Sequence, residues 1–384
     1  MSICTPEGFI AGTASAELRS DGSDDLAVVI NEGPKWAAAA VFTKNKVKAA
    51  PVLWSEQAIK SGLCRAVVLN SGGANACTGA QGFEVAHKTA EHLAQKLEAG
   101  AIEVQVCSTG LIGKQLDISK LKPAIDQAVE SASKAGGEAA AWAILTTDTQ
   151  AKMEVIQRPN YSLAGMIKGA GMLAPDLATM LCVITTDAEL TSEELNHALK
   201  NAVEKTLNRI DSDGCTSTND TVLIMSSGAK GRCDLREFET DLKVLLHKLG
   251  QKLINDAEGS TKTITVTVKN CATEEMATSA ARAVARNNLF KTAMYGADPN
   301  WGRILAALGV IDFDFDQFKV DVYLNGSLVC KSGESFNAKT KTEIDLSDRL
   351  IEVVIDFNQG NATSTVWTND LSERYVYENS AYST

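Results

Sequence analysis

The chain has 384 residues, of which 45% are hydrophobic and 22% charged, and its formal net charge is −11. This length and composition are typical of a globular protein that can bury sizeable cores in two or three domains. The negative charge argues against nucleic acid or an anionic membrane as the main partner, because either partner requires a basic face. No apolar run approaches the ~18 residues that span a bilayer, and residues 1–12 lack a signal-peptide pattern, so we expect a cytoplasmic protein.

The spacing of cysteines and histidines indicates neither a disulfide framework nor a metal centre. The nine cysteines form no C-x-x-C pair and are odd in number, which favours free thiols in a reducing compartment. The four histidines show no H-E-x-x-H or comparable ligand spacing. We therefore expect no metal ion and no resident cofactor.

Strands and helices are expected along the whole chain. Short β-rich runs bounded by Gly, Pro, Asn or Asp predict strands at 25–31, 38–43, 65–70, 102–107, 222–227, 263–268, 318–324 and 350–356. Apolar residues at helical spacing predict helices at 83–97, 118–134, 137–145, 192–208, 235–256 and 273–286. Because no linker, repeat or low-complexity tract separates these elements, they predict a mixed α/β or α+β protein with layered sheets.

A glycine-rich loop follows the third predicted strand, at residues 71–82. Its glycines, at positions 72, 73, 79 and 82, do not form G-x-G-x-x-G. Gly110 and Gly113 are too close together for a phosphate-binding loop. These small residues are instead expected to let backbones approach closely around a pocket.

Three polar segments beside the predicted elements are candidates for binding or chemistry. Thr109 and Gly110 follow the strand 102–107, where a hydroxyl and an open N–H could stabilise an oxyanion, although a polar turn is the commoner use of such residues. The run TTDT at 146–149 suits either a substrate-binding loop or a helix cap. Glu258 could bind a substrate ammonium or could be a solvated surface residue.

The segment 168–187, KGAGMLAPDLATMLCVITTD, combines a cation, two glycines and a proline before an apolar, strand-like run. Such a segment can be bent just before Thr179. One hypothesis is that the chain cuts itself between Ala178 and Thr179, by attack of the Thr179 hydroxyl on the Ala178 carbonyl. The freed N-terminal threonine would carry nucleophile and base in one residue, because its α-amine can take the hydroxyl proton. The same pattern is typical of an ordinary glycine-rich turn that leads into a core strand.

Nine segments, in order along nearly the whole chain, together carry a resemblance that no single motif carries. They are VFTKNKVKAAPV (41–52), NSGGANACTG (70–79), CSTGLIG (107–113), AILTTDT (143–149), KGAGMLAPDLATML (168–181), TSTNDT (216–221), DAEGSTK (256–262), DPNWGR (298–303) and NSAYST (379–384). On these segments the chain resembles the bacterial ornithine acetyltransferases, the glutamate N-acetyltransferases (ArgJ family) of arginine biosynthesis.

The resemblance implies a layered α/β fold of the self-processing, DmpA-like kind. It implies cleavage into an α chain, 1–178, and a β chain, 179–384, which stay associated as an α2β2 heterotetramer. Thr179 would be the acetyl-accepting nucleophile, and Thr109 with Gly110 the oxyanion hole. The implied reaction is a ping-pong transfer of acetyl from N2-acetylornithine to glutamate. The implied substrate contacts are Thr147, Lys168, Thr179, Glu258, Asn379 and Thr384.

Three positions depart from the family pattern and leave the pocket or the cleavage rate open. Gly73 stands where an asparagine is expected, Asp176-Leu177 where Asn-Met is usual, and Cys215 where many members have aspartate. No CoA-specific motif is present, so the use of acetyl-CoA as a second acetyl donor also stays open. Two other interpretations remain: an N-terminal-threonine aminopeptidase or amidase with water as acyl acceptor, and a non-catalytic amino-acid-binding relative.

Overall fold

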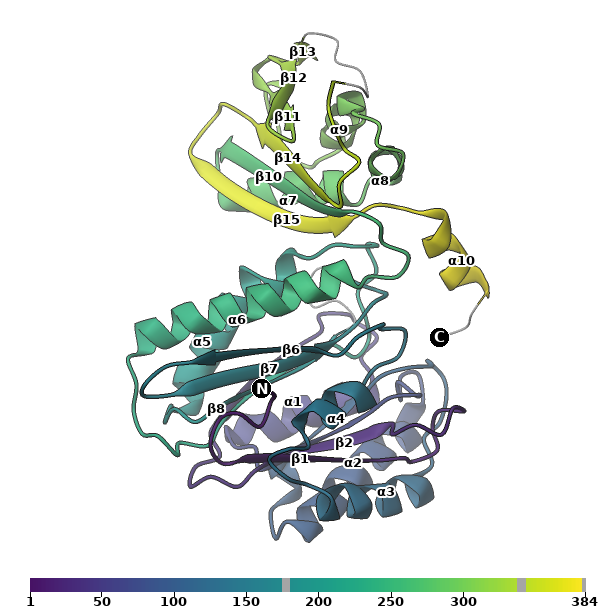
Figure 1. The fold of residues 1–384 in the computed structure, drawn as a ribbon, viewed down its shortest axis with the longest axis vertical. Coiled ribbons are helices and arrows are strands. Elements are labelled where there is room, and N and C mark those ends of the chain that lie inside the picture. Colours follow the sequence, from purple (N-terminus) through teal and green to yellow (C-terminus); the bar gives the residue numbers. More distant parts are fainter. Residues whose placement is uncertain (175–179, 337–342, 382–384) are drawn as a thin grey trace.

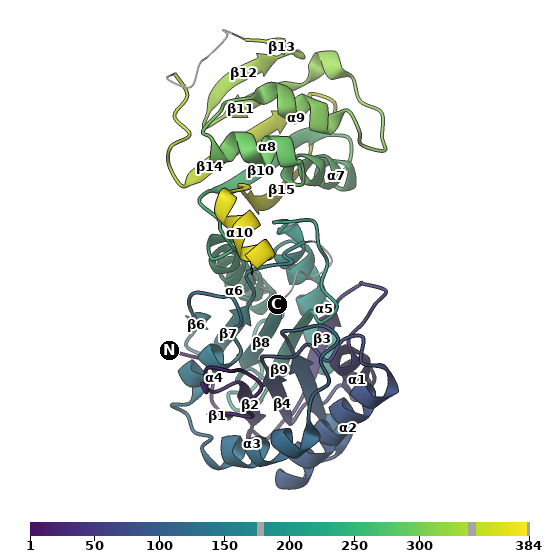
Figure 2. The same cartoon turned by 90° about the vertical axis from the view of Figure 1, so that its right-hand side faces the viewer.

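The computed structural model describes residues 1–174, 180–336 and 343–381, which form two lobes (Figure 1). The first lobe ends with helix α6 at Asn255, and the second lobe contains the described part of 263–369. After the second lobe, helix α10 (Glu373–Ala381) returns towards the first lobe (Figure 2). Within the described residues, no helix is both long and apolar enough to span a bilayer.

Two stacked sheets form the centre of the first lobe. The four-stranded sheet has the order β1-β2-β4-β5, with bounds Phe9–Ala14, Leu26–Asn31, Ala66–Asn70 and Val104–Ser108. The five-stranded sheet has the order β3-β9-β8-β7-β6, with bounds Ala38–Phe42, Thr221–Ser226, Leu181–Thr186, Ser162–Lys168 and Lys152–Gln157. Apolar side chains of both sheets, among them Val29, Leu69, Met166 and Val183, belong to one cluster. The central strands β2, β4, β8 and β9 are therefore buried on both faces.

Helices cover the outer faces of the two sheets (Figure 1). The four-stranded sheet packs against α1 (Ala50–Ala58), α2 (Gly79–Lys96) and α3 (Ile118–Glu130). The five-stranded sheet packs against α5 (Ser192–Glu204) and α6 (Leu235–Asn255). Helix α4 (Gly137–Ala143) contributes to the cluster between the sheets. These helix, sheet, sheet and helix layers confirm the predicted mixed α/β protein with layered sheets.

The second lobe is a six-stranded sheet with helices packed on it. Its strand order is β13-β12-β11-β14-β10-β15, with bounds Glu334–Ser335, Ser327–Lys331, Asp321–Leu324, Leu350–Asp356, Thr263–Cys271 and Ala362–Asn369. Helices α7 (Glu274–Ala285), α8 (Asn288–Tyr295) and α9 (Trp301–Leu308) share one apolar cluster with this sheet. Strand β15 also lies against the first lobe, because Ile210 and Trp367 form a β-bridge.

The position of the predicted cut falls between two neighbouring strands of the five-stranded sheet. Strand β7 pairs antiparallel with β8, with Lys168 opposite Leu181. In the sheet order, β8 and β9 lie between β3 and β7, so the two strands that follow position 179 are flanked on both sides by strands that precede it. Ala178 and Thr179 themselves lie outside the described residues. The division into 1–178 and 179–384 therefore stays a prediction.

Most predicted elements are present, with boundaries that differ by a few residues. The predicted helix 192–208 ends at Glu204 and is followed by the 3₁₀ helix η3 (Leu207–Arg209). The predicted strands 102–107 and 318–324 begin as 3₁₀ helices, η2 (Ala101–Glu103) and η4 (Gln317–Lys319); the remaining one, η1, is Ile59–Ser61. Strands β1, β6 and β7 and helices α1, α8, α9 and α10 were not predicted, and no bounds were predicted for β12, β13 and β15. Helices of eight or nine residues contain too few turns for an apolar repeat to stand out.

Candidate active site

The loops that follow β4 and β5 meet where these two parallel strands end. The strand register pairs Asn70 with Ser108, and the Gly73 N–H donates to the Thr109 carbonyl at 2.9 Å. Gly110 has a φ of 120°, and a Cβ at this position would lie 2.6 Å from the Gly73 nitrogen. Because only glycine fits there, the predicted pair Thr109 and Gly110 lies on a tightly packed turn at the end of a buried strand.

Lys168, the last residue of β7, brings a buried ammonium to this turn. Its side chain is 1% exposed, and Nζ donates to Thr146 Oγ1 at 2.7 Å and to Thr109 Oγ1 at 3.3 Å. Burial lowers the pKa of Lys168 below its ordinary value, and the charges of Asp148 and Glu258 oppose this shift. A cation beside Thr109 can bind the carboxylate of a substrate.

Glu258 lies beside Thr147 and brings a carboxylate to the same region. Its Oε1 accepts a hydrogen bond from Thr147 Oγ1 at 2.7 Å, and its Oε2 accepts one from Asn379 Nδ2 at 3.0 Å. A Cβ at Gly171 would lie 2.6 Å from this carboxylate, so the absence of a side chain at Gly171 allows this position of the Glu258 carboxylate. Three predicted contacts from distant segments, Thr147, Glu258 and Asn379, are thus brought together, and the carboxylate can accept from an ammonium.

Two cavities border these residues. One, of about 610 Å³, is lined by Thr147, Glu258 and side chains of α10, including Tyr377. The other, of about 310 Å³, is lined by Gly110, Lys114 and Thr147 among others. Thr147 lines both cavities, so the oxyanion candidate Gly110 and the carboxylate of Glu258 face adjoining spaces of a size that suits an amino acid.

The structure adds three buried charges that the sequence analysis did not assign. Asp148 lies 3.6 Å from the Lys168 ammonium and 2.5 Å from that of Lys152, and Lys152 lies 2.5 Å from Asp256. Burial opposes ionisation of Asp148, but the two lysines outweigh it, so the pKa of Asp148 lies below its usual value. Asp148 and Asp256 belong to segments that the sequence analysis singled out. Their proximity has no local signal, because 108 residues separate them.

Three predicted residues, Ala178, Thr179 and Thr384, lie outside the described residues, so their roles stay predictions. The next residue after Thr179, Met180, is described, and its N–H donates to Asp220 Oδ1 at 2.9 Å. Asp220 is fully buried, and burial raises its pKa well above the usual value. Asp220 is therefore a further ionisable group next to the predicted cut, within the motif TSTNDT.

Two of the three departures from the family pattern can be placed. A Cβ at Gly73 would lie 2.6 Å from Leu116 Cδ2, so Leu116 occupies the space that an asparagine side chain would need. Cys215 is exposed, and its N–H donates to Asp213 Oδ1 at 3.1 Å. Asp176-Leu177 lies outside the described residues.

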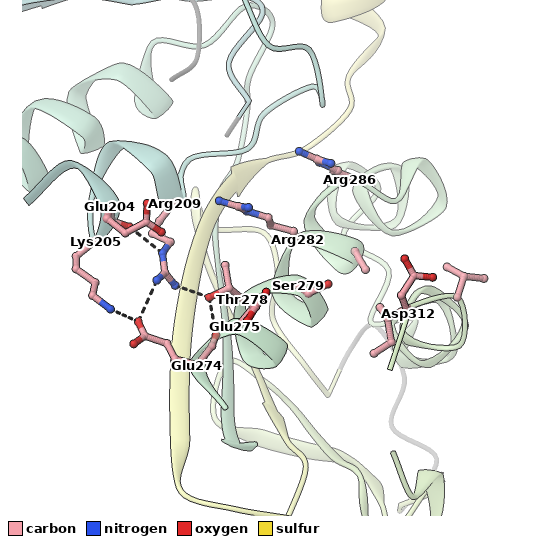
Figure 3. A pocket seen from close by; sticks show the side chains of 13 residues that line it. Glu204, Lys205, Arg209, Glu274, Glu275, Thr278, Ser279, Arg282, Arg286 and Asp312 are labelled. Carbon is pink, nitrogen blue, oxygen red and sulfur yellow. Dashed lines mark hydrogen bonds and ion pairs between the residues drawn. The ribbon is translucent and has the colours of Figure 1, made fainter. Parts of the chain in front are cut away.

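A separate cavity of about 730 Å³ lies where α5 and η3 face α7 (Figure 3). Arg209 donates to Thr278 Oγ1 at 2.7 Å and pairs with Glu274 at 3.0 Å, and Lys205 pairs with the same carboxylate. These ion pairs link residues of the first lobe to α7 of the second, so the cavity is part of the contact between lobes. Among the described residues, no group of three or more His, Cys, Asp or Glu side chains could hold a metal ion.

The layered fold and the buried polar centre define a mixed α/β protein whose site suits a small amino-acid ligand. The model of the ArgJ family matches residues 10–384, and the chain belongs to this family. It is 52% identical, over the full length of both chains, to an arginine biosynthesis bifunctional protein ArgJ of Streptomyces coelicolor. It is 48% identical to the protein of the same name from Mycobacterium tuberculosis, with 99% of this chain and 96% of the relative covered.

Solved structures of related proteins match parts of the chain. An ornithine acetyltransferase from Mycobacterium tuberculosis, complexed with ornithine, is 48% identical and matches 47% of this chain and 96% of that chain, with a TM-score of 0.45. An arginine biosynthesis bifunctional protein argJ from Bacillus halodurans is 32% identical and matches 52% of this chain and 97% of that chain, with a TM-score of 0.49.

Proposed function

We propose that the chain is a self-processing acetyltransferase of arginine biosynthesis, which transfers the acetyl group of N2-acetylornithine to glutamate and releases ornithine and N-acetylglutamate. The observation that carries the proposal is the buried cation of Lys168 beside the Thr109–Gly110 turn, with the carboxylate of Glu258 bonded to Thr147 nearby. These opposite charges match the carboxylate and ammonium groups of an ornithine-like amino acid. Membership of the ArgJ family and the names of the relatives support the same reaction.

In the proposed maturation step, the Thr179 hydroxyl attacks the Ala178 carbonyl carbon. The peptide C–N bond breaks, and the hydroxyl proton passes to the new α-amine of Thr179. Water then hydrolyses the ester, which leaves a carboxylate on Ala178 and restores the hydroxyl of Thr179. The products 1–178 and 179–384 would stay associated, because β8 and β9 of the second product lie between β3 and β7 of the first in the five-stranded sheet.

In the proposed transfer, the α-amine of Thr179 takes the hydroxyl proton while Oγ1 attacks the acetyl carbonyl of N2-acetylornithine. Thr109 and Gly110 stabilise the oxyanion. Breakage of the C–N bond and return of the proton release ornithine and leave an acetyl ester on Thr179. The neutral amine of glutamate then attacks this ester and forms N-acetylglutamate. Lys168 would bind the substrate carboxylate, and Glu258 an ammonium.

The remaining proposed substrate contacts are Thr147, Asn379 and Thr384. The proposed assembly is an α2β2 heterotetramer in the cytoplasm, without a resident cofactor or metal ion. Because the relatives are named bifunctional proteins, acetyl-CoA is to be assayed in place of N2-acetylornithine as a second acetyl donor.

The test is an end-product assay with N2-acetylornithine and glutamate, read by mass spectrometry for the wild type and for Thr179→Ala. The wild type is expected to give ornithine and N-acetylglutamate in equal amounts, and Thr179→Ala neither. Release of acetate without N-acetylglutamate would indicate an amidase. Binding of ornithine without either product would indicate a non-catalytic binding protein, and each of these two results contradicts the proposal.

A further inference from the structure

Four charged side chains of alternating sign form a buried charge network behind the candidate active site. In order they are Lys168, Asp148, Lys152 and Asp256, with successive nitrogen–oxygen distances of 3.6, 2.5 and 2.5 Å. The exposed fraction of each side chain is between 0 and 4%. Two cations and two anions are thus removed from water together.

A contribution to folding stability does not by itself explain such a charge network. Removing an ion from water costs several kcal/mol, and well-packed apolar residues of similar volume often give equal or greater stability. A buried ion network is therefore better explained by the groups whose position and charge it fixes.

Backbone hydrogen bonds connect the charge network to the two ends of the candidate substrate site. Asp148 Oδ1 accepts the Gly169 N–H at 2.6 Å, which ties it to the backbone directly after Lys168. Asp256, which is two residues before Glu258 in sequence, accepts the Thr149 N–H through Oδ2 at 3.0 Å. The charge network thus holds the segment that carries Lys168 and the segment that carries Glu258 at a fixed separation.

We propose that Asp148 is a positioning residue for substrate binding: its carboxylate keeps the Lys168 ammonium charged and in place beside Thr109, and the Lys152–Asp256 pair holds Asp148. The inference rests on the proposed function, since it assigns the substrate carboxylate to Lys168. It adds Asp148 as the group that makes a fully buried lysine usable as a cation.

The charges around Lys168 predict shifts of opposite sign in its pKa for two substitutions. Asp148 and Glu258 favour its charged form, whereas burial and Lys152 disfavour it. Asp148→Asn keeps the shape of the side chain but removes the facing charge, so the pKa of Lys168 is expected to fall. Lys152→Gln removes the competing cation, so the pKa of Lys168 is expected to rise. A lysine that binds a carboxylate acts below its pKa, so affinity is lost as the pH rises through that pKa.

The experiment is isothermal calorimetry of ornithine binding between pH 6 and 10, on cleaved enzyme whose folding has been checked by thermal unfolding. The alkaline limb is the pH range in which the Kd for ornithine rises as Lys168 loses its proton. Ornithine ionises identically in every titration, so the alkaline limbs of the wild type and the variants can be compared directly. Asp148→Asn is expected to raise the Kd at least 10-fold and to move the limb down by about one pH unit, since a facing charge shifts a pKa by ~1–3 units. Lys152→Gln is expected to move the limb up.

Asp241→Asn is the matched control. Asp241 is equally buried and pairs with Arg158 at 2.6 Å, at the opposite end of the β6–β7 hairpin. It is expected to lower the melting temperature without moving the limb. The inference would be overturned if the alkaline limb of both Asp148→Asn and Lys152→Gln stayed at the pH of the wild type, or if both limbs moved in the same direction. If Asp148→Asn does not fold, the direction in which the limb of Lys152→Gln moves decides between the two results. A wild type that binds ornithine but transfers no acetyl group contradicts only the proposed function.

Discussion

At the scale of single residues, Glu258 is the carboxylate that the proposed function assigns to the ammonium of an amino-acid ligand. Glu258→Gln keeps the size of the side chain and removes that charge. Because a hydrogen bond to a charged group contributes ~1.5–3 kcal/mol, the KM for N2-acetylornithine is expected to rise about 10- to 100-fold with a smaller change in kcat. Glu378→Gln is the control, since Glu378 lines the same cavity but pairs with Arg374 at 2.6 Å. Steady-state kinetics that show equal KM values for the two variants would contradict this role.

Gly110 is the residue at which backbone geometry and proposed chemistry coincide. Gly110→Ala would place a Cβ 2.6 Å from the Gly73 nitrogen and must displace the turn. Loss of an oxyanion donor costs ~10²–10³ in kcat, so a loss of at least 100-fold is expected in single-turnover acetylation. Gly113→Ala separates this effect from strain, because Gly113 also has a positive φ, 81°, but open space around its Cβ position. A similar kcat for both variants would exclude Gly110 from the oxyanion hole.

At the scale of elements, α10 is attached to the molecule by few contacts, and no residue of this helix is buried. Truncation after Ser372 would remove Asn379 and Thr384 but little apolar contact area. The melting temperature is expected to change by only a few degrees, while the KM for N2-acetylornithine rises at least 10-fold. Asn379→Ala distinguishes the helix from the terminal residue: if it reproduces none of the rise, the interaction of Asn379 with Glu258 does not contribute to binding.

The sequence predicts those elements whose residues have strong local patterns. Strand β2 and helix α6 appear close to their predicted bounds, because apolar content, a turn residue or an Asp234 cap marks each of them. The motifs identify Thr109, Lys168 and Glu258, but no local pattern shows that Lys168 reaches Thr109 or that Lys152 lies between Asp148 and Asp256. Those contacts depend on strand register and on the packing of β5, β7 and the end of α6.

At the scale of the whole molecule, Asp211 lies where the lobes meet, since its N–H donates to the Trp367 carbonyl at 2.9 Å. Its carboxylate is buried beside Arg286, and burial raises its pKa to about 6. The folded state therefore binds this proton more tightly than the unfolded state, and the stability that the proton confers is lost as the pH rises through 6. At about 1.4 kcal/mol per pKa unit, the contribution is about 3 kcal/mol.

Denaturant unfolding of the wild type and Asp211→Asn at several pH values measures this contribution. The difference in the free energy of unfolding, wild type minus variant, is expected to increase by about 2 kcal/mol between pH 7 and pH 4, and to approach the full contribution of about 3 kcal/mol only below the unfolded pKa of ~3.9. A difference that stays constant or decreases over that range would show that the contact between lobes does not titrate through Asp211.

Self-cleavage before Thr179, on which the proposed transfer depends, is tested by the intact mass of the purified protein under denaturing conditions. The wild type is expected to give two fragments, of 178 and 206 residues, the larger beginning at Thr179. The two are expected to stay together in native buffer, because β8 and β9 of the larger fragment lie between β3 and β7 of the smaller one in the five-stranded sheet. Thr179→Ala is expected to give one chain of 40.8 kDa. A single uncut chain from active wild type would contradict the claim.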